Sequence, residues 1–236
     1  MIRIGTSGFQ YPEWKGTFYP EDLSTAKMLG FYAERFATTE SNYTFRQIPK
    51  ATTLEKWSAQ TPEDFRFSLK APQRITHFSK LRDCGETLRY FCSVAGALGP
   101  KLGPILFQLP PSLQKDLPLL TSFLADLPTG VFAAFEFRHA SWFDEEVFGA
   151  LRTAGAALCL AQSEELETPI VSTGSFGYLR LRKLEYAPKE IESWARLIRE
   201  HPEWHEVFVY FKHEEAGTGP VFAQALIQAL ERSASS

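Results

Sequence analysis

Short runs rich in β-branched and aromatic residues alternate along the chain with segments that have the apolar periodicity of amphipathic helices. The runs that predict strands cover residues 2–6, 38–42, 65–70, 104–109, 132–138, 156–161, 176–182 and 206–212. The segments that predict helices cover residues 26–36, 51–60, 84–98, 116–127, 144–154, 188–200 and 219–231. Residues 162–175 show no clear helical pattern.

Eight strands that alternate with helices predict an α/β fold, specifically a single (β/α)8 TIM barrel in which the sixth helix is weak or missing. The chain of 236 residues is long enough for one such domain,. We expect the domain to cover residues 1–232 and to leave 233–236 as a frayed tail. A doubly wound open sheet is the alternative, because a count of strands does not show that the sheet closes.

Several predicted strands carry polar side chains on one face only. The segment Phe65–Lys70 alternates strictly between apolar and polar residues, and Phe135–Arg138 and Tyr178–Arg182 repeat the pattern,. In a barrel the apolar face packs on the helices, so the polar face points into the lumen. Burying a lone charge there costs several kcal/mol, so we expect these charges at the open, C-terminal ends of the strands, which form the mouth of the barrel.

The predicted mouth carries more basic than acidic side chains, although the whole chain has a net charge of −3. Its basic residues are Lys70, Arg138, Arg180, Arg182 and Lys212, and its acidic residues are Glu40 and Glu136. This excess predicts a local site for phosphate or carboxylate, because low-dielectric walls strengthen such attraction. The alternative is that the same residues form a salt-bridge network that only closes the barrel.

Chemical roles follow from the side-chain types. We expect Glu40, Lys70, Glu136 and His139 to be the catalytic candidates, since carboxylates, amines and imidazoles transfer protons. Arginine offers a fork of donors to an anion, and aromatic rings stack on sugars or bases. The predicted substrate- or anion-binding residues are Asn42, Gln108, Arg138, Trp142, Tyr178, Arg180, Arg182, Tyr210 and Lys212.

A metal site is not predicted, and no particular cofactor is indicated. Although His77, His139 and His213 lie near predicted strand ends, five nearby cations would repel a metal ion,. The chain lacks an apolar run of the ~18 residues that a membrane span needs,. Three cysteines and the absence of a signal-peptide pattern predict a cytoplasmic protein,.

Several motifs resemble those of the YecE-like family (domain of unknown function 72). The resembling segments are Ile4–Phe9, Tyr11–Gly16, Phe18–Pro20, Glu40–Phe45, Thr61–Lys70, Ile75–His77, Leu102–Pro111 and Phe135–Trp142. The resemblance implies a TIM barrel but no established activity. The chain departs from the family pattern with Arg182–Lys183 where a His-Gly pair is usual, and with Lys212–His213 where Asn-Asn is usual. Both departures add positive charge to the predicted mouth.

The sequence favours an enzyme or a binding protein that acts on a phosphorylated or otherwise anionic small molecule. A nucleic-acid-binding or endonuclease-like barrel is the first alternative, because Arg74, Lys80 and Arg82 extend the positive charge beyond the mouth,. A non-catalytic interaction protein is the second. The expected partner is therefore an anionic small molecule or a nucleic acid and not a membrane, while the sequence does not determine the oligomeric state.

Overall fold

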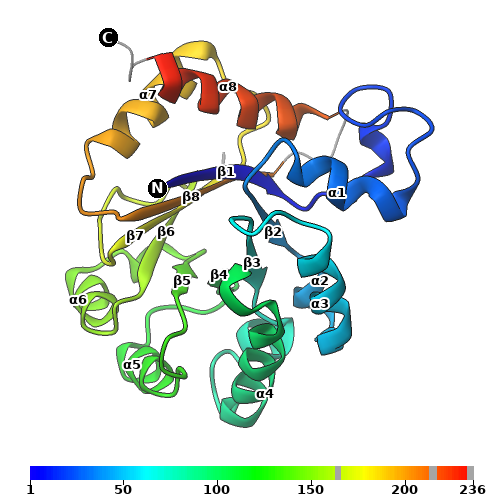
Figure 1. Cartoon of the computed structure of the whole chain (residues 1–236). Helices are drawn as coiled ribbons and strands as arrows, with labels where there is room; N and C mark the ends of the chain where they lie inside the picture. The colour runs from blue at the N-terminus through cyan, green and yellow to red at the C-terminus, as the bar shows by residue number, and fades with distance from the viewer. Residues whose placement is uncertain (163–165, 213–216, 233–236) are drawn as a thin grey trace.

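The chain forms a closed barrel of eight parallel strands, in which each strand pairs with its neighbours in sequence and β8 pairs with β1. The computed structural model describes residues 1–162, 166–212 and 217–232. The strands are β1 (Ile2–Ser7), β2 (Thr38–Ser41), β3 (Arg66–Lys70), β4 (Leu102–Gln108), β5 (Ala133–Glu136), β6 (Ala157–Gln162), β7 (Phe176–Leu181) and β8 (Glu206–Phe211). The predicted TIM barrel is confirmed, and the open-sheet alternative is excluded (Figure 1).

Helices surround the barrel (Figure 1). They are α1 (Met28–Ala33), α2 (Tyr43–Arg46), α3 (Ala51–Ala59), α4 (Gly85–Ala95), α5 (Leu117–Ala125), α6 (Glu145–Thr153), α7 (Pro188–Arg199) and α8 (Thr218–Arg232). Between β6 and β7 the described residues 166–175 contain no helix, as the weak pattern there predicts. The short helix α2 was not predicted, and the predicted tail 233–236 lies outside the described residues.

The two faces of each strand contact different surroundings, which explains the alternation in the sequence. Phe107 and Phe135 face outward, where their rings stack with centroids 5.3 Å apart, and Phe135 also meets Phe123 of α5 edge to face. Inside the barrel, aliphatic, small and aromatic residues such as Leu106, Ala134, Cys159, Tyr178 and Tyr210 fill the middle of the lumen. The lumen is therefore packed, and ligand chemistry is confined to its ends.

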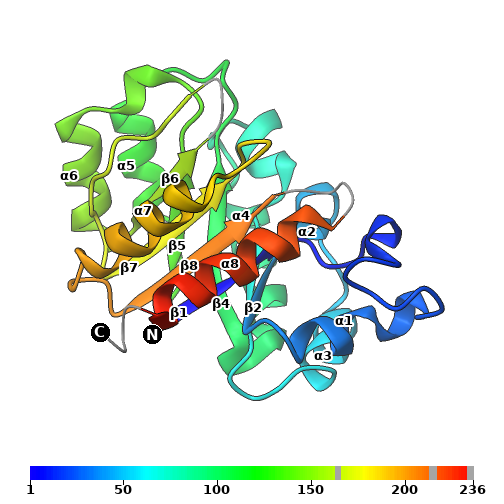
Figure 2. The same ribbon diagram turned by 90° about the horizontal axis from the view of Figure 1, so that it is seen from above.

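Helices α7 and α8 pack side by side across β7, β8 and β1, where they close the barrel between its last and first strands (Figure 2). Helix α7 has its apolar residues on one face, including Ile191, Trp194 and Ile198, and this face is buried,. No helix among the described residues combines the length and the apolarity needed to cross a lipid bilayer.

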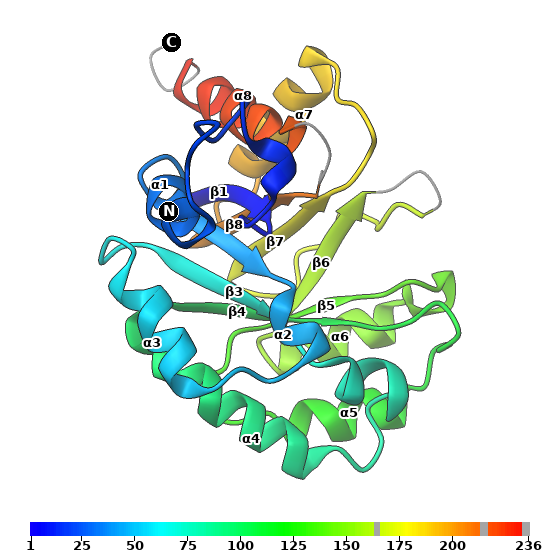
Figure 3. The same cartoon turned by 90° about the vertical axis from the view of Figure 1, so that its right-hand side faces the viewer.

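The long segment between β1 and α1 folds back beside the start of α8 (Figure 3). Gly217, with φ near 74°, lies against Thr17, and a Cβ atom at this glycine would be 2.5 Å from Thr17 Oγ1. Trp14 and Tyr19 of the same segment are buried, with stacked rings 6.0 Å apart. The segment is thus a packed part of the barrel's C-terminal side.

Candidate functional site

A buried chain of ion pairs crosses the top of the lumen. Arg180, at the end of β7, points Nη2 at Glu40 Oε1 of β2 at 2.8 Å and Nη1 at Glu136 Oε2 of β5 at 2.5 Å. All three side chains are at most 2 % exposed. Alternation places all three on the lumenal face, and barrel closure brings them together from strands far apart in sequence. One guanidinium is therefore shared by two buried carboxylates.

Glu40 is also held by hydrogen bonds from side chains of β1 and β7. Its Oε1 accepts from Ser7 Oγ at 2.5 Å, and its Oε2 accepts from the Tyr178 hydroxyl at 2.7 Å. Asn42 Nδ2 donates to Ser7 Oγ at 2.8 Å. Ser7 was not among the predicted site residues. The sequence signal was its position at the end of the first predicted strand, and the structure shows that it is the register partner of Glu40.

A second, more accessible layer of cations lies around Glu136. Arg138 Nη2 forms an ion pair with Glu136 Oε1, and Arg182 Nη1 lies 3.8 Å from the same oxygen. Their side chains are 17 % and 23 % exposed. Several buried donors of this cluster lack a hydrogen-bond acceptor among the described residues: Nε of Arg138, Arg180 and Arg182, and Nη1 of Arg182. Three guanidiniums share one carboxylate and retain unused donors.

Lys70, at the end of β3, differs from these arginines because its direct partners among the described residues, Gln108 and Phe45, are uncharged. Its Nζ donates to Gln108 Oε1 at 2.7 Å and lies 4.1 Å from the centroid of the Phe45 ring. The Phe45 ring also contacts the His77 ring edge to face, with the ring centroids 4.9 Å apart. Lys70 and Gln108 thus form the rim of the mouth opposite β7.

Burial and neighbouring charges shift several pKa values at the mouth. Burial lowers the pKa of Lys70 to about 8, and Arg180 adds to this effect while Glu136 and Glu40 oppose it,. Burial also lowers the pKa of Arg180, but Glu136 and Glu40 outweigh it and hold that pKa well above its usual value. Burial, helped by Glu40, raises the pKa of Tyr178. Lys70 is therefore the cation here that most readily loses its proton.

The three aromatic residues predicted to bind ligand are buried, which corrects the expectation that their rings stack on a substrate. Tyr178 and Tyr210 are fully enclosed in the lumen, and the Tyr210 hydroxyl donates to Ser68 Oγ at 2.7 Å. Trp142 is also fully buried, stacks on Phe137 with centroids 4.8 Å apart, and donates Nε1–H to Leu113 O at 2.7 Å. These rings shape and support the site without an exposed face.

Two predicted residues lie at the edge of the cluster. His139 Nδ1 accepts from the backbone N–H of Ser141 at 3.2 Å and contacts Ser141 Oγ at 2.8 Å, so it caps the turn Ala140–Trp142. Lys212 is half-buried after β8 and contributes to the lowered pKa of Lys70. His139 thus has a local structural role, whereas Lys212 belongs to the positive rim.

The described residues contain no group of three or more His, Cys, Asp or Glu side chains that is arranged to hold a metal ion. His77 Nδ1 is engaged by Thr76 Oγ1 at 2.9 Å, and burial together with Lys70 lowers its pKa. His213, which was also considered as a ligand, lies outside the described residues.

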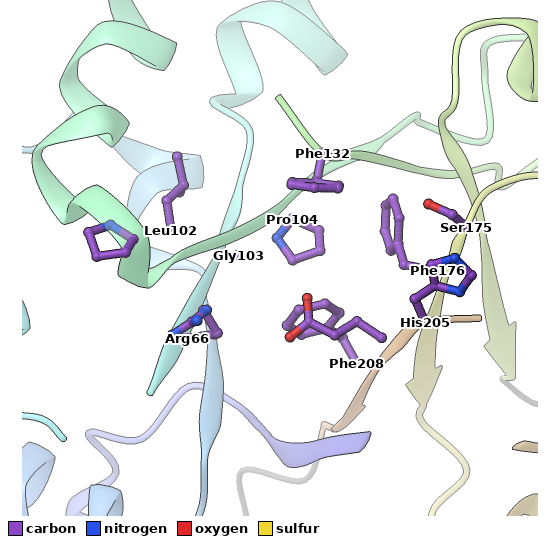
Figure 4. Close-up of a pocket in the computed structure, with 11 residues that line it drawn as sticks. Arg66, Leu102, Gly103, Pro104, Phe132, Ser175, Phe176, His205 and Phe208 are labelled. Atoms are coloured by element: carbon purple, nitrogen blue, oxygen red, sulfur yellow. The ribbon is translucent and has the colours of Figure 1, made fainter. Parts of the chain in front are cut away.

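A separate cavity of about 430 Å³ opens at the opposite, N-terminal end of the barrel (Figure 4). Phe132, Phe176 and Pro104 line it, with Arg66 on one side and His205 on the other. The charged residues at this end are largely occupied, since Arg3 pairs with Glu206 at 2.8 Å and Arg66 Nη1 donates to backbone carbonyls. The unused donors and the shifted pKa of Lys70 instead place the candidate site at the mouth.

Comparison with known proteins agrees with the fold. The family described as "Protein of unknown function DUF72" matches residues 3–236. A DUF72 family protein from Thermotoga maritima superimposes with a TM-score of 0.87 at 26 % identity, covering 98 % of this chain and 99 % of that one. A DUF72 family protein from Enterococcus faecalis gives a TM-score of 0.82 at 18 % identity, covering 98 % and 96 %.

Two curated relatives are also similar. The UPF0759 protein YecE of Escherichia coli (strain K12) is 33 % identical over 144 residues, which cover 61 % of this chain and half of YecE. The UPF0759 protein YunF of Bacillus subtilis (strain 168) is 24 % identical over an alignment that covers 98 % of this chain and 95 % of YunF. The match to the family spans nearly the whole chain, and the protein therefore belongs to the DUF72 family.

Proposed function

We propose that the mouth of the barrel binds a phosphorylated or otherwise anionic small molecule. The observation that carries this proposal is that Arg138, Arg180 and Arg182 share Glu136, while each of the three guanidiniums keeps a buried N–H for which the described residues provide no acceptor. An unmet buried donor costs about 1–3 kcal/mol. An incoming oxyanion would satisfy these donors and balance the surplus charge.

The burial of each residue distinguishes a ligand-binding site from a salt-bridge network that only closes the barrel. The inner layer consists of Glu40, Arg180 and Glu136 and is fully buried. Its ion pairs leave one negative charge in excess, and we assign it a role in stabilising the fold. The outer layer adds Arg138 and Arg182, which remain partly exposed, so the five described residues of the two layers together carry a net positive charge. The inner layer therefore fits the alternative of a purely structural salt-bridge network. The outer layer is the part that we propose binds a ligand.

The test is isothermal titration calorimetry with inorganic phosphate, sulfate and a panel of sugar phosphates. We expect wild type to bind at least one phosphate compound with a Kd of millimolar or lower. The double variant Arg138→Gln/Arg182→Gln should weaken binding at least tenfold, because two charge-assisted donors are lost. Arg152→Gln, which removes an exposed arginine paired with Glu145 on α6, is the matched control and should leave binding unchanged.

Absence of binding at millimolar concentration in wild type would overturn the proposal. Equal binding by the double variant would also contradict it, since it would place the anion elsewhere. Thermal unfolding of each variant, measured in parallel, separates the loss of a binding group from the loss of the fold.

A nucleic-acid partner is the second candidate function, and one groove favours it. The groove has a volume of about 510 Å³, lies beside the mouth, and is lined by Phe45, Arg46, Arg74, Phe78 and Tyr90 among others. Phe78 and Tyr90 are 72 % and 60 % exposed, which leaves their rings free to stack on bases,. Of the predicted basic strip, however, Arg82 is paired with Asp116 at 2.8 Å.

Binding of a fluorescent single-stranded oligonucleotide at several salt concentrations tests this candidate. We expect a nucleic-acid partner to bind more weakly as salt increases, because phosphate contacts release counterions. Phe78→Ala should then weaken binding, since base stacking contributes about 1–3 kcal/mol. Affinity that does not change with salt, or with Phe78→Ala, would exclude this candidate.

The proposal also includes a cytoplasmic location. All three cysteines, Cys84, Cys92 and Cys159, are free thiols, and Cys84 and Cys159 are buried. Burial raises the pKa of each of them. Such thiols suit a reducing compartment. Cell fractionation with an antibody to the protein would test this part of the proposal.

A further inference from the structure

We propose that Lys70 is an amine nucleophile that condenses with the carbonyl carbon of a phosphorylated aldehyde or ketone held at the mouth. The inference rests on the proposed function, because the arginines around Glu136 supply the subsite for the phosphate group. It goes further in two respects: it assigns the class of substrate, a small carbonyl compound that carries a phosphate group, and it assigns a covalent step to Lys70.

The direct contacts of Lys70 leave its amine able to lose its charge. Gln108 Oε1 accepts an N–H from Nζ at 2.7 Å, and a neutral amine can still donate that N–H, although more weakly than an ammonium,. No carboxylate of the described residues lies within ion-pair distance of Nζ, in contrast to the four lysines or arginines that pair with acids at or near the strand ends. Gln108 therefore holds the nitrogen in both protonation states, and it favours the ammonium less than a carboxylate partner would.

The surroundings of Lys70 also favour the neutral form. Burial is the largest cause of its lowered pKa, and the positive charges of Arg180 on β7 and Lys212 after β8 add to it. Glu136 on β5 and Glu40 on β2 act in the opposite direction. At a pKa of about 8, roughly one-tenth of the lysine is neutral at pH 7, compared with about one in 3,000 for an ordinary lysine,.

The positive rim would position the carbonyl compound for attack. Arg138 and Arg182 can offer its phosphate group buried donors that have no acceptor in residues 1–162, 166–212 and 217–232. Lys70 lies at the end of β3, on the side of the barrel opposite β7, and Arg180 and Glu136 both contribute to the shift of its pKa. Holding both groups in place makes the attack effectively intramolecular.

The covalent step needs no reagent beyond the substrate. The electron pair of neutral Nζ forms a C–N bond to the carbonyl carbon, while the C=O π pair moves to oxygen. Transfer of a proton from nitrogen to that oxygen gives a carbinolamine. Loss of water after a further protonation of the oxygen then gives a protonated imine, and hydrolysis reverses these steps. Such an iminium withdraws electrons from the neighbouring carbon, which prepares it for loss of a proton or for carbon–carbon cleavage.

Reductive trapping tests the inference directly. Wild-type protein is incubated with glyceraldehyde 3-phosphate and sodium cyanoborohydride, and the adduct is measured by intact mass and located by peptide mapping. We expect one adduct per chain, at Lys70, formed at least tenfold faster than with unphosphorylated glyceraldehyde. The initial rate should rise with pH through about 8, following deprotonation of Lys70.

Two lysine variants provide the comparison. Lys70→Arg keeps the positive charge but removes the amine, so it should abolish the specific adduct. Lys101→Arg is the matched control: Lys101 Nζ is engaged by the carbonyls of Ser58 and Thr61 on the far side of α3, and its replacement should leave the trapping rate unchanged. Labelling spread evenly over surface lysines, or equal labelling of Lys70→Arg and wild type, would overturn the inference.

Calorimetry with inorganic phosphate on the same proteins separates this inference from the proposed function. If wild type and Lys70→Arg bind phosphate but wild type is not trapped, the covalent role of Lys70 is wrong and the anion site stands. If wild type neither binds phosphate nor is trapped, both proposals fail. Trapping at Lys70 that is lost in Arg138→Gln/Arg182→Gln would support both together.

Discussion

Arg180 Nη2 and Glu40 Oε1 lie 2.8 Å apart in the interior of the barrel, although the two residues are separated by 140 positions in the sequence. They reach each other across the lumen from β7 and β2. Because Arg180 also binds Glu136, this guanidinium ties three strands together at the point where the lumen opens. The pair thus links the closure of the barrel to the electrostatics of its mouth.

Removal of this guanidinium should strongly destabilise the fold. In Arg180→Met, Glu40 and Glu136 remain buried without their shared counter-charge, and breaking a buried ion pair in this way costs about 3–5 kcal/mol. Urea unfolding followed by circular dichroism measures the change in the free energy of unfolding. Arg152→Met, which breaks only an exposed pair with Glu145, should change it by less than about 1 kcal/mol,. Similar losses in the two variants would contradict this view of the inner layer.

Lys70 should make stability depend on pH in a defined range. Its pKa is about 8 in the folded protein against 10.5 for an unperturbed lysine, so between these values the unfolded chain binds a proton that the folded chain does not. Stability from this group therefore increases from pH 8 to about 10.5, whereas below pH 8 the full penalty of burying the charge is present. The shift corresponds to at most about 3 kcal/mol.

The measurement compares urea unfolding of wild type and Lys70→Met at pH 7, 8, 9 and 10. The free energy of unfolding of wild type should rise relative to the variant above pH 8, and parallel curves would refute the predicted shift. Sulfate affinity gives a second readout, since sulfate itself does not titrate in this range. Its binding to wild type should weaken as pH rises through 8, and Lys70→Met should lack that dependence.

Trp142 should matter for stability but not for anion binding. Trp142→Phe keeps most of the stacking on Phe137 but leaves the buried carbonyl of Leu113 without its donor, which costs about 1–3 kcal/mol,. Calorimetric titration of phosphate should give the same Kd as wild type once both proteins are folded. If Trp142→Phe folds normally but binds phosphate much more weakly than wild type, Trp142 contributes to the binding site as the sequence predicted.

Gly5 is required by the close approach of β1 to β2. A Cβ atom at this position would lie 2.0 Å from the backbone oxygen of Thr38 and 2.7 Å from the Tyr32 hydroxyl. Gly5→Ala should therefore destabilise the protein by about 1–3 kcal/mol or more, because the strands must move apart. Gly149→Ala is the control in α6, where no atom lies within 4 Å of the new methyl group, and it should raise stability by about 0.5–1 kcal/mol,. Thermal melts of both variants test the contrast.

The sequence predicted the location of the candidate site better than the function of its parts. Alternation identified Glu40, Glu136 and Arg180 as lumenal residues at strand ends, and the structure brings them into contact. Their chemical roles remain predictions. The stacking role expected of Trp142 was misplaced, because a tryptophan just after a strand gives no local sign of whether it turns toward the mouth or toward the outer helices.

Local periodicity determined which residues line the barrel and which face the helices, because the side chains of a strand alternate regardless of what the strand packs against. It therefore also predicted that acidic residues and arginines gather at the C-terminal end of the barrel. Only the tertiary structure decided which guanidinium meets which carboxylate, and that the ionic residues divide into a buried inner layer and an accessible outer one. The ion pairing and the two layers depend on how strands from distant parts of the chain are tilted and staggered against one another. That tilt and stagger exist only after the barrel has closed.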